Sequence, residues 1–298
     1  MNDGFVLLDG GLSTALEALW IDTSGDLWTA WAAWRRPDDL IRAHRSFVDA
    51  GAEIVTTASY QCDTELLERA GADTRTAREV LASTTDLARR ATEGTTCRVA
   101  ASIGPFGASL ADGSEYTGDY PVPWKVVESF HRRRLEVLID SGPDLFAVET
   151  IPRRDEARLV AELLVEFGAP QAWFSFGCRT ATTTYGGDDA RATVETVLDY
   201  PNLTAVGVNC IAPGLVSDLL RTFGDVAVPL VVYPNHGRRW DGIEREWTGD
   251  AESIDDDLVA SWFARGARFV GGCCGTGPDG IARLAESRAR LANRGEFT

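Results

Sequence analysis

Eight short apolar runs, spread along the whole chain, constrain the fold more than any other feature of this 298-residue sequence. Each run is bounded by turn residues and enriched in β-forming side chains, which is typical of a strand. Helical periodicity fills most of the gaps, as in Arg78–Thr92, Val126–Ile139 and Glu156–Phe167. The predicted strands are Phe5–Asp9, Glu53–Thr57, Arg98–Ile103, Leu145–Glu149, Ala172–Phe176, Ala205–Asn209, Leu230–Tyr233 and Arg268–Gly271.

This alternation predicts an α/β fold with parallel strands buried on both faces. Eight strand–helix units in a chain of this length match a (β/α)₈ barrel of the TIM type. An open, doubly wound sheet is the alternative, but no clean GxGxxG motif follows the first strand. No linker or internal repeat is visible, so we expect a single domain over residues 1–298. The irregular stretches 104–124 and 178–190 are expected to be loops over a site at the barrel rim.

Composition excludes several classes of partner. The formal net charge of −16 argues against nucleic acid, and the basic run His131–Arg134 is expected to be a solvated helix face. No apolar stretch approaches the roughly 18 to 20 residues that span a bilayer. The N-terminus lacks the basic segment of a secretory signal. We therefore expect a cytoplasmic protein, a monomer or small homo-oligomer, with reduced thiols.

Six cysteines stand in the sequence, and three of them fall at predicted strand ends. Cys210 follows the sixth strand, and the adjacent pair Cys273 and Cys274 follows the eighth. A barrel would bring these thiols to one rim, where three thiolates can bind zinc and leave a fourth position open. A glycine-rich phosphate grip is an alternative for GGCCGTG. The remaining cysteines, Cys62, Cys97 and Cys178, are expected to be packing residues.

Two carboxylates, Asp9 and Glu149, also end predicted strands. Asp9 could cap a following helix, and Glu149 could be a structural ion-pair partner. A carboxylate buried at a barrel mouth is costly unless a cation is bound beside it. A substrate ammonium group would serve as that cation.

Several segments together resemble one family in order along nearly the whole chain. They are DGG at 9–11, TTASYQ at 56–61, SIGPFGASLADGSEYTGDY at 102–120, ETIP at 149–152, GVNC at 207–210, LVVYPN at 230–235 and GGCCGT at 271–276. By its resemblance in these segments, the sequence is identified as a member of the homocysteine S-methyltransferase family. The ADGSEYTGDY loop is similar to the branch that uses S-methylmethionine or S-adenosylmethionine as methyl donor.

The resemblance implies a zinc-dependent barrel enzyme that methylates L-homocysteine to methionine. It implies that Cys210, Cys273 and Cys274 bind Zn²⁺. For homocysteine it implies that Asp9 and Glu149 hold the amino group, that the Gly10-Gly11 turn offers N–H groups to the carboxylate, and that Thr57 makes a polar contact. Asn209 and Asn235, which lie inside matching motifs, are also expected to bind substrate.

Some positions fall outside this pattern. His236 stands where close relatives commonly have a small residue, and it is expected beside the site. His44 and His131 lie on predicted helices and are expected at the surface. The aromatic candidates for a cation–π contact with a sulfonium donor are Tyr116, Tyr120, Trp124 and Trp240.

Zinc-bound thiolate and a sulfonium would react by in-line displacement, because the sulfonium methyl is already electrophilic. Two alternatives stay open at this stage. One is a methyltransferase of the same fold that uses betaine or another onium donor. The other is a non-catalytic barrel in which zinc is structural, although that would require a fourth protein ligand.

Overall fold

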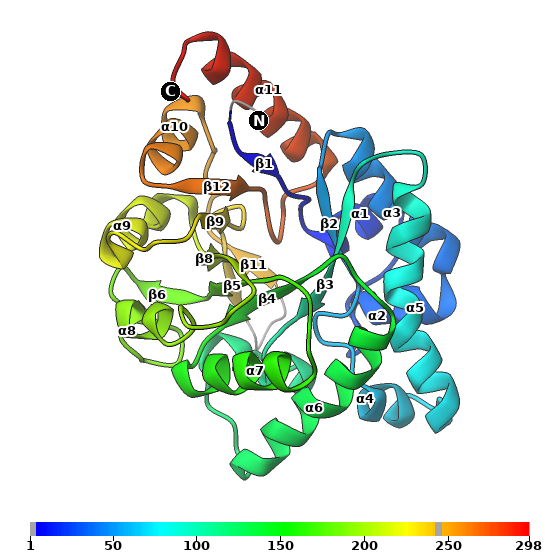
Figure 1. The fold of residues 1–298 in the computed structure, drawn as a ribbon. Helices are drawn as coiled ribbons and strands as arrows, with labels where there is room; N and C mark the ends of the chain where they lie inside the picture. Colours follow the sequence, from blue (N-terminus) through cyan, green and yellow to red (C-terminus); the bar gives the residue numbers. More distant parts are fainter. Residues whose placement is uncertain (1–3, 242–245, 298) are drawn as a thin grey trace.

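All eight predicted strands form, and they pair in parallel in one ring (Figure 1). The computed structural model describes residues 4–241 and 246–297. The ring strands are β1 (Val6–Leu7), β2 (Ile54–Thr56), β3 (Arg98–Ile103), β4 (Leu145–Ile151), β5 (Ala172–Phe176), β8 (Leu203–Asn209), β9 (Leu230–Tyr233) and β12 (Ala267–Val270).

The ring closes between its first two strands. The sheet order is β1-β12-β9-β8-β5-β4-β3-β2, and a parallel bridge joins Leu8 to Ile54 across the remaining gap. The Asp9 N–H also donates to the Ile54 carbonyl oxygen at 3.1 Å. The predicted (β/α)₈ TIM-type barrel is therefore confirmed, and the open-sheet alternative is wrong.

Helices surround the strands and connect them in the order expected for a barrel (Figure 1). The three helices predicted above form within four residues of the expected ends. The helices are α1 (Leu12–Ala18), α2 (Thr29–Arg35), α3 (Pro37–Asp49), α4 (Thr64–Arg69), α5 (Thr74–Thr92), α6 (Trp124–Asp140), α7 (Arg154–Glu166), α8 (Ala190–Glu195), α9 (Pro213–Phe223), α10 (Asp256–Ala264) and α11 (Pro278–Asn293).

The interior of the ring is packed with side chains that come from every strand or its immediate end. Trp173 of β5 is fully buried there, and it packs in one cluster with the small Ala100, Ala147 and Ala205 of neighbouring strands. Its indole N–H donates to the hydroxyl of Tyr233 at 3.0 Å. A bulky ring packed among alanines combines large and small side chains, which is how such interiors reach native packing density.

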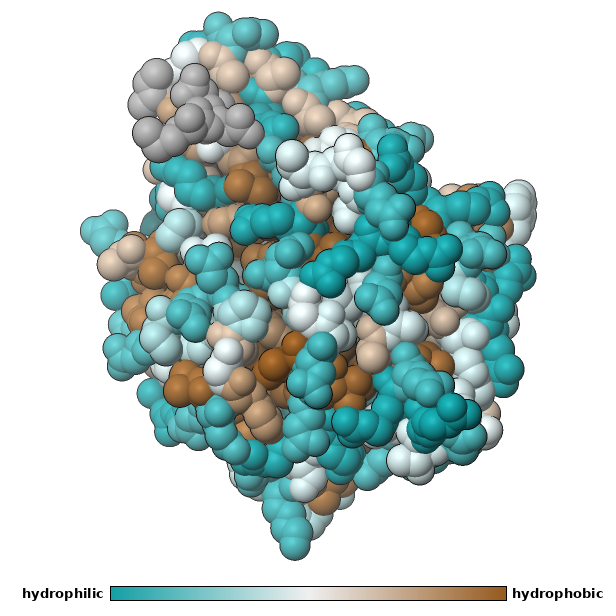
Figure 2. All heavy atoms as spheres, turned by 45° about the vertical axis from the view of Figure 1, so that its right-hand side comes forward, coloured by the Kyte–Doolittle hydropathy of each residue, from teal (hydrophilic) through white to brown (hydrophobic). Residues whose placement is uncertain are grey.

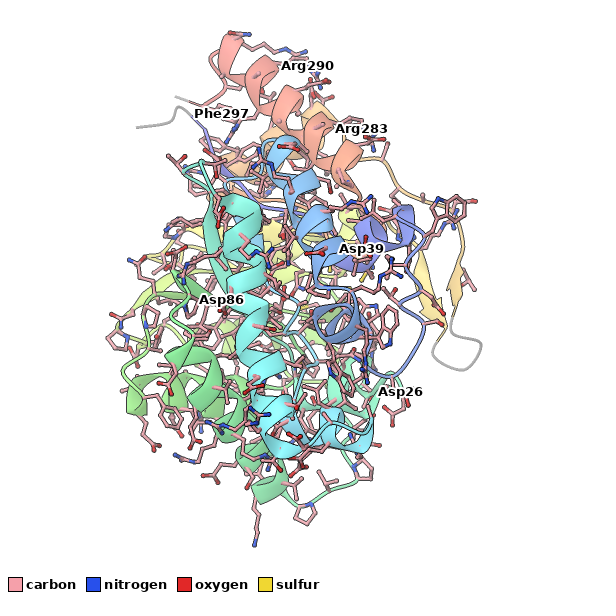
Figure 3. The ribbon with its side chains drawn as sticks, turned by 90° about the vertical axis from the view of Figure 1, so that its right-hand side faces the viewer. Asp26, Asp39, Asp86, Arg283, Arg290 and Phe297 are labelled. Carbon is pink, nitrogen blue, oxygen red and sulfur yellow. The ribbon has the colours of Figure 1, made fainter. Side chains whose placement is uncertain are left out.

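A second, larger apolar cluster lies between the strands and the helices. On the outside, charged side chains such as Asp86 on α5 and Arg283 and Arg290 on α11 lie away from the barrel (Figure 3). Hydrophilic side chains cover most of the face in Figure 2, and apolar ones show between them. Within the described ranges, no helix is long and apolar enough to cross a membrane.

The two long irregular stretches do fold over the carboxyl ends of the strands. The first holds two 3₁₀ turns, η1 (Phe106–Leu110) and η2 (Ser114–Tyr116), and the second holds the hairpin of β6 (Cys178–Thr180) and β7 (Thr183–Thr184). A further hairpin pairs β10 (Arg239–Asp241) with β11 (Glu246–Thr248).

The expected surface positions of His44 and His131 are wrong, because both side chains are fully buried. Burial lowers the pKa of His44 to about 4. His131 Nε2 forms a 2.8 Å hydrogen bond with Glu156, whose carboxylate is also buried and also accepts from the Phe106 N–H and the Tyr120 hydroxyl. These groups fix η1 against α6 and α7.

The basic run is likewise not a uniformly solvated face, since the guanidinium of Arg134 is fully buried. It donates to the carbonyl oxygens of Gly104 at 3.0 Å, Ser59 at 2.7 Å and Tyr60 at 2.9 Å. These carbonyls belong to the loops after β2 and β3. Arg134 therefore gives the Gly104 carbonyl its donor and adds a second hydrogen bond to the Ser59 and Tyr60 carbonyls, which also accept from the Cys62 and Gly104 N–H groups.

Candidate active site

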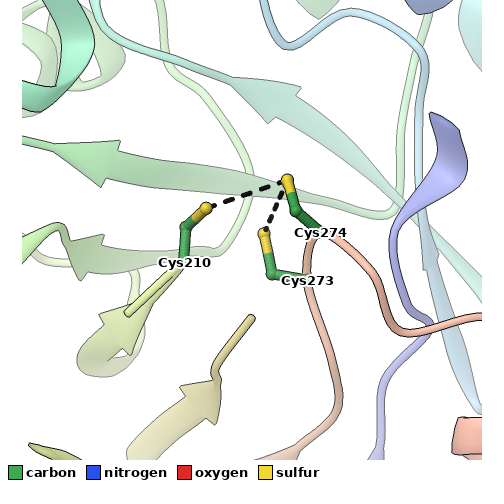
Figure 4. A group of neighbouring side chains, drawn as sticks. All are labelled: Cys210, Cys273 and Cys274. Atoms are coloured by element: carbon green, nitrogen blue, oxygen red, sulfur yellow. Dashed lines mark hydrogen bonds between the residues drawn. The ribbon is translucent and has the colours of Figure 1, made fainter. Parts of the chain in front are cut away.

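The three cysteines at the strand ends meet at one point. Cys210 follows β8, whereas Cys273 and Cys274 follow β12, and their sulfur atoms point toward one another (Figure 4). The Sγ atom of Cys274 lies 3.8 Å from that of Cys210 and 4.0 Å from that of Cys273. All three atoms lie within 4.8 Å of one another, and no second group of this kind occurs among the residues that the structure describes.

Backbone hydrogen bonds explain why these sulfurs converge. The Cys210 N–H donates to the carbonyl oxygen of Tyr233 at 3.2 Å, and the Cys273 N–H donates to that of Pro234 at 2.8 Å. Both acceptors lie at the end of β9, which stands between β8 and β12 in the sheet. Cys210 also adopts a left-handed backbone with φ 52°, a conformation that non-glycine residues hold only where the surroundings enforce it.

The spacing of the sulfurs fits a tetrahedral metal ion. Zinc–sulfur bonds of about 2.3 Å at tetrahedral angles separate two ligand sulfurs by about 3.8 Å, close to the two separations above. Hydrogen bonds within the trio lower the pKa of Cys210 well below its ordinary value and raise the pKa of Cys273 and Cys274. One thiolate is therefore favoured, and a bound cation would favour ionisation of the other two.

Hydrogen bonding disfavours the alternative of a phosphate grip at GGCCGTG, because most N–H groups of this turn already have protein acceptors. Gly271 donates to the Val232 carbonyl at 3.0 Å, Gly272 to that of Asp9 at 3.0 Å, and Gly275 to the Thr14 hydroxyl at 3.0 Å. A phosphate cradle needs such groups pointing outward toward the anion. The turn instead fixes the two adjacent cysteines.

The two predicted carboxylates lie buried at the same rim. Asp9, just after β1, accepts from the Thr56 N–H at 2.7 Å and from the Thr56 hydroxyl at 3.1 Å. Glu149, in β4, accepts from the Ser102 hydroxyl. Asp9 does not accept from the first turn of α1, whose N-cap is Gly11 without a side-chain cap. The capping alternative for Asp9 is therefore wrong.

Burial perturbs both carboxylates strongly. Desolvation raises the pKa of Asp9 to about 8, and the nearby charge of Glu149 contributes to that rise. Desolvation also raises the pKa of Glu149 to about 7. Two neighbouring buried carboxylates with raised pKa values resist carrying two negative charges without a cation, so this corner favours a cationic ligand.

The three cysteine sulfurs and the two carboxylates border one cavity, whose volume of about 560 Å³ is within the range of small-molecule sites. Its lining includes the three cysteines, Asp9 and Glu149. The predicted constellation is thus assembled around a single space, although its members come from four different strand ends.

Comparison with known proteins agrees with this arrangement. The family described as homocysteine S-methyltransferase matches residues 6–288. The chain belongs to the homocysteine S-methyltransferase family. It is 38% identical to the homocysteine S-methyltransferase of Escherichia coli (strain K12) over 94% of each chain. It is also 34% identical to a selenocysteine Se-methyltransferase of Brassica oleracea var. italica, over 98% of this chain and 90% of that protein.

Solved structures give the same assignment. The metallated form of the homocysteine methyltransferase MmuM from Escherichia coli superposes with a TM-score of 0.84, at 37% identity and 96% coverage of both chains. The apo form of the same protein superposes with a TM-score of 0.74. The family resemblance predicted from the sequence is therefore confirmed, while the donor-specific branch stays a prediction.

Within this homocysteine S-methyltransferase fold, the Gly10-Gly11 turn packs tightly against the cysteine turn. A Cβ on Gly10 would lie 2.3 Å from the Thr276 carbonyl oxygen, so only glycine fits. The Gly11 N–H already donates to that oxygen at 2.9 Å, so Gly11 is engaged within the protein. Thr57 is buried in the cavity lining, where its hydroxyl bonds to Ser59 Oγ at 2.6 Å and accepts from the Ser102 N–H.

The two asparagines differ in their surroundings. Asn209 lines the cavity, but its amide also holds Thr150, accepting from the Thr150 N–H and donating to its hydroxyl, both at 2.7 Å. Thr150 has φ 58° directly after Glu149, so Asn209 helps to position that carboxylate. Asn235 is not among the described residues of the lining, and its amide oxygen accepts from the Gly237 N–H at 2.8 Å. Its contact with substrate stays a prediction.

Of the aromatic candidates, only Tyr116 lines the cavity within the described side chains. The Tyr120 hydroxyl donates to Glu156 at 2.7 Å, and the ring of Trp124 lies under the guanidinium of Arg153. The side chain of Trp240 lies outside the described residues. His236 does line the cavity, and its ring occupies the space that a Cβ on Gly275 would need.

Sequence reasoning missed part of the lining. Glu115 and Tyr60 face the cavity, as does the segment from Asp22 to Thr29. The loop 104–124 was expected over the site, so a position near the cavity could have been predicted for Glu115. The segment after α1 carries no strand-end signal, and its place at the rim follows only from the three-dimensional path of the chain.

Proposed function

We propose that this protein transfers a methyl group from a sulfonium donor to the sulfur of L-homocysteine, giving methionine. One observation supports this proposal more strongly than any other. A trio of thiols with metal-like spacing and a pair of buried carboxylates open into one cavity, so a single amino acid can present its sulfur to the first and its ammonium group to the second.

We propose zinc as the resident metal, held by Cys210, Cys273 and Cys274. The all-sulfur donor set suits zinc, and the metallated form of a solved relative supports a metal in this fold. Bound zinc would lower the pKa of a substrate thiol that joins it, so that the sulfur is a thiolate at neutral pH.

The carboxylates Asp9 and Glu149 would bind the homocysteine ammonium group. Their raised pKa values mean that, below about pH 7 to 8, protons compete with the ammonium group for these two carboxylates. An ammonium group between them stabilises both charges and fixes the amino acid. Asn209, through Thr150, and Ser102 hold Glu149 in place for this contact.

The charge of the cavity favours a cationic methyl donor. Six carboxylates belong to its lining, namely Asp9, Glu17, Asp22, Asp26, Glu115 and Glu149, and no lysine or arginine occurs among the described lining residues. S-Methylmethionine and S-adenosylmethionine each carry a net positive charge, whereas betaine is neutral overall. Such a site attracts the two sulfonium donors more strongly.

In the reaction, the homocysteine sulfur forms a bond to the methyl carbon while the bond from that carbon to the donor sulfur breaks. The electron pair of the broken bond stays on the donor sulfur, and two uncharged thioethers result. The cavity would contribute alignment and exclusion of water. A structural metal without catalysis is the weaker alternative, because the sulfurs open into a cavity instead of a closed core.

The test is methionine formation by the metal-loaded protein with homocysteine and each of three donors: S-methylmethionine, S-adenosylmethionine and betaine. We expect methionine with one or both sulfonium donors and little with betaine. Methionine from betaine alone would reject the donor assignment. Absence of methionine with every donor would reject the function.

A further inference from the structure

A third carboxylate of the cavity, Glu115, is not used by the mechanism above. It lies in η2, on the loop that follows β3, and it lines the cavity. Its Oε2 atom is out of contact with solvent and has no hydrogen-bond partner among the described residues. Burial raises the pKa of this carboxyl to about 7. A buried carboxylate oxygen without a partner is costly unless a ligand provides a donor or a cation.

Glu115 is set apart from the carboxylate pair that would hold homocysteine. Asp9 follows β1 and Glu149 lies in β4, and the charge of Glu149 raises the pKa of Asp9. Glu115 lies on η2, where the charge of Asp112 acts on its carboxyl, and the charge of Cys210 acts on both Glu149 and Glu115. The cavity therefore has two anionic regions: one at the ends of β1 and β4, and one on η2 beside the sulfur of Cys210.

Tyr116 places this second region beside the sulfurs that would hold the metal. Its hydroxyl lies 3.7 Å from the Sγ atom of Cys210. Its ring meets that of Tyr185 edge-on, with centroids 5.4 Å apart, and the Tyr185 hydroxyl donates to the Cys210 carbonyl at 3.0 Å. An aromatic ring and a carboxylate on adjacent residues thus flank the point where a methyl group must approach.

The backbone of this loop is held firmly. A Cβ on Gly107 would lie 2.6 Å from the backbone nitrogen of Glu115, so η1 and η2 are in close contact there. Ser114 bonds through its hydroxyl to Asp112 Oδ1 at 2.5 Å, and its carbonyl accepts from the Gly118 N–H at 2.8 Å. Glu115 is therefore pre-positioned, which reduces the ordering needed when a ligand binds.

We propose that Glu115 binds the positively charged part of the methyl donor and, with the ring of Tyr116, forms a donor subsite distinct from the homocysteine subsite. The inference rests on the proposed function and deepens it. Once the ammonium group of homocysteine occupies the Asp9–Glu149 region, Glu115 remains as a lining carboxylate with a buried oxygen that has no partner among the described residues, and its neighbour Tyr116 lies 3.7 Å from the Cys210 sulfur. A donor that brings its own cation binds there, and a donor that is neutral overall gains less.

The test uses the metal-loaded E115Q protein, which keeps the shape of the side chain and removes its charge. D119N is the matched control, because Asp119 is an exposed carboxylate of the same loop outside the described lining. Binding of S-methylmethionine is measured by calorimetry in the presence of homoserine, whose ammonium group fills the Asp9–Glu149 region and whose hydroxyl is too weak a nucleophile to take the methyl group. The KM values for donor and for homocysteine are then measured separately, along with metal content.

We expect E115Q to weaken S-methylmethionine binding and to raise the donor KM by about 30-fold or more. The homocysteine KM and metal content should change less than about twofold, and D119N should resemble the wild type. Equal donor binding by E115Q and wild type would overturn the inference and leave the function intact. Parallel rises in both KM values would also overturn it. If the wild type forms no methionine with any donor, the function itself fails, and with it the donor subsite.

Discussion

Replacing Asp9 by asparagine should stabilise the substrate-free protein while weakening its binding of homocysteine. Asp9 is 3% exposed, and burial raises its pKa from 3.8 to about 8. A group whose folded-state pKa is raised makes the fold lose stability as pH rises from the unfolded value to the folded value. The wild type therefore loses stability through Asp9 between about pH 4 and pH 8, and the asparagine variant lacks this contribution while it keeps those of Glu149 and Glu115.

The size of this effect follows from the pKa shift. At pH 8, a shift of this magnitude corresponds to about 5 kcal/mol. Asparagine keeps one acceptor oxygen for Thr56 but loses part of the hydrogen bonding, at a cost of about 1–2 kcal/mol. The net stabilisation is about 3 kcal/mol at pH 8, or about 6 °C in Tm for a chain of this size. Near pH 4 the advantage disappears.

Thermal unfolding of both proteins across pH 4 to 8, without homocysteine, measures this difference. Asp86→Asn on the outer face of α5 is the control, because that exposed carboxylate should change Tm by very little (Figure 3). Homocysteine affinity, measured by calorimetry, should fall about 30-fold or more in Asp9→Asn because one partner of the ammonium group is lost. A variant less stable than the wild type at every pH, or one with normal affinity, would refute the reasoning.

Three other predictions concern the metal, the pH dependence and the fold. Cys273→Ser should lower metal affinity more than about 100-fold, since even changes to groups outside the ligand shell cost about 10–100-fold. The control Cys97→Ser, at a half-buried cysteine away from the trio, should keep its metal. Metal analysis of both proteins tests this, and a fully loaded Cys273→Ser protein would contradict the site. The kcat/KM for homocysteine should fall by up to about tenfold per pH unit as Asp9 is protonated below pH 8, and more steeply below pH 7 as Glu149 is protonated too, because the protonated carboxyls no longer attract an ammonium ion. A flat profile from pH 6 to 8 would count against the ammonium site. Arg134→Met should destabilise the fold by about 3–5 kcal/mol, because three hydrogen bonds from a charged group are lost and the Gly104 carbonyl loses its donor, while the Ser59 and Tyr60 carbonyls keep a backbone N–H. Arg132→Met on the same helix should cost about 1 kcal/mol or less, and similar Tm values for the two variants would contradict the role given to Arg134.

The barrel was predictable from sequence because its signal is repeated eight times. Errors of a few residues in single strands, such as Leu203–Asn209 beginning two residues before its predicted start, do not change the count or the order. The cysteine and carboxylate positions were predictable for a related reason. A parallel barrel brings all strand ends to one rim, so a strand-end residue such as Cys210 or Glu149 is placed by topology alone.

Burial of polar helix residues was not predictable in the same way. His131 and Arg134 sit in a run of basic residues, which usually indicates a solvated face. Whether such a side chain turns inward depends on acceptors from distant segments, here the carboxylate of Glu156 on α7 and the carbonyl of Gly104 after β3. Those acceptors are in reach only once α7 and the loop after β3 have packed against α6.

The roles of single polar residues at the site were also only partly accessible. Gly11 is engaged with the Thr276 carbonyl, and Asn209 holds the strained Thr150, so both have structural duties beside any contact with substrate. Glu115 could be placed near the site by its loop. Its buried oxygen without a partner became visible only in three dimensions.

The measurement that tests the central claim most directly is X-ray absorption at the zinc edge of the reduced, metal-loaded protein, before and after homocysteine is added. The account predicts one zinc per chain with three sulfur neighbours at about 2.3 Å, and a fourth sulfur once homocysteine binds. Fewer than three sulfur neighbours, or a zinc environment that homocysteine leaves unchanged, would contradict it.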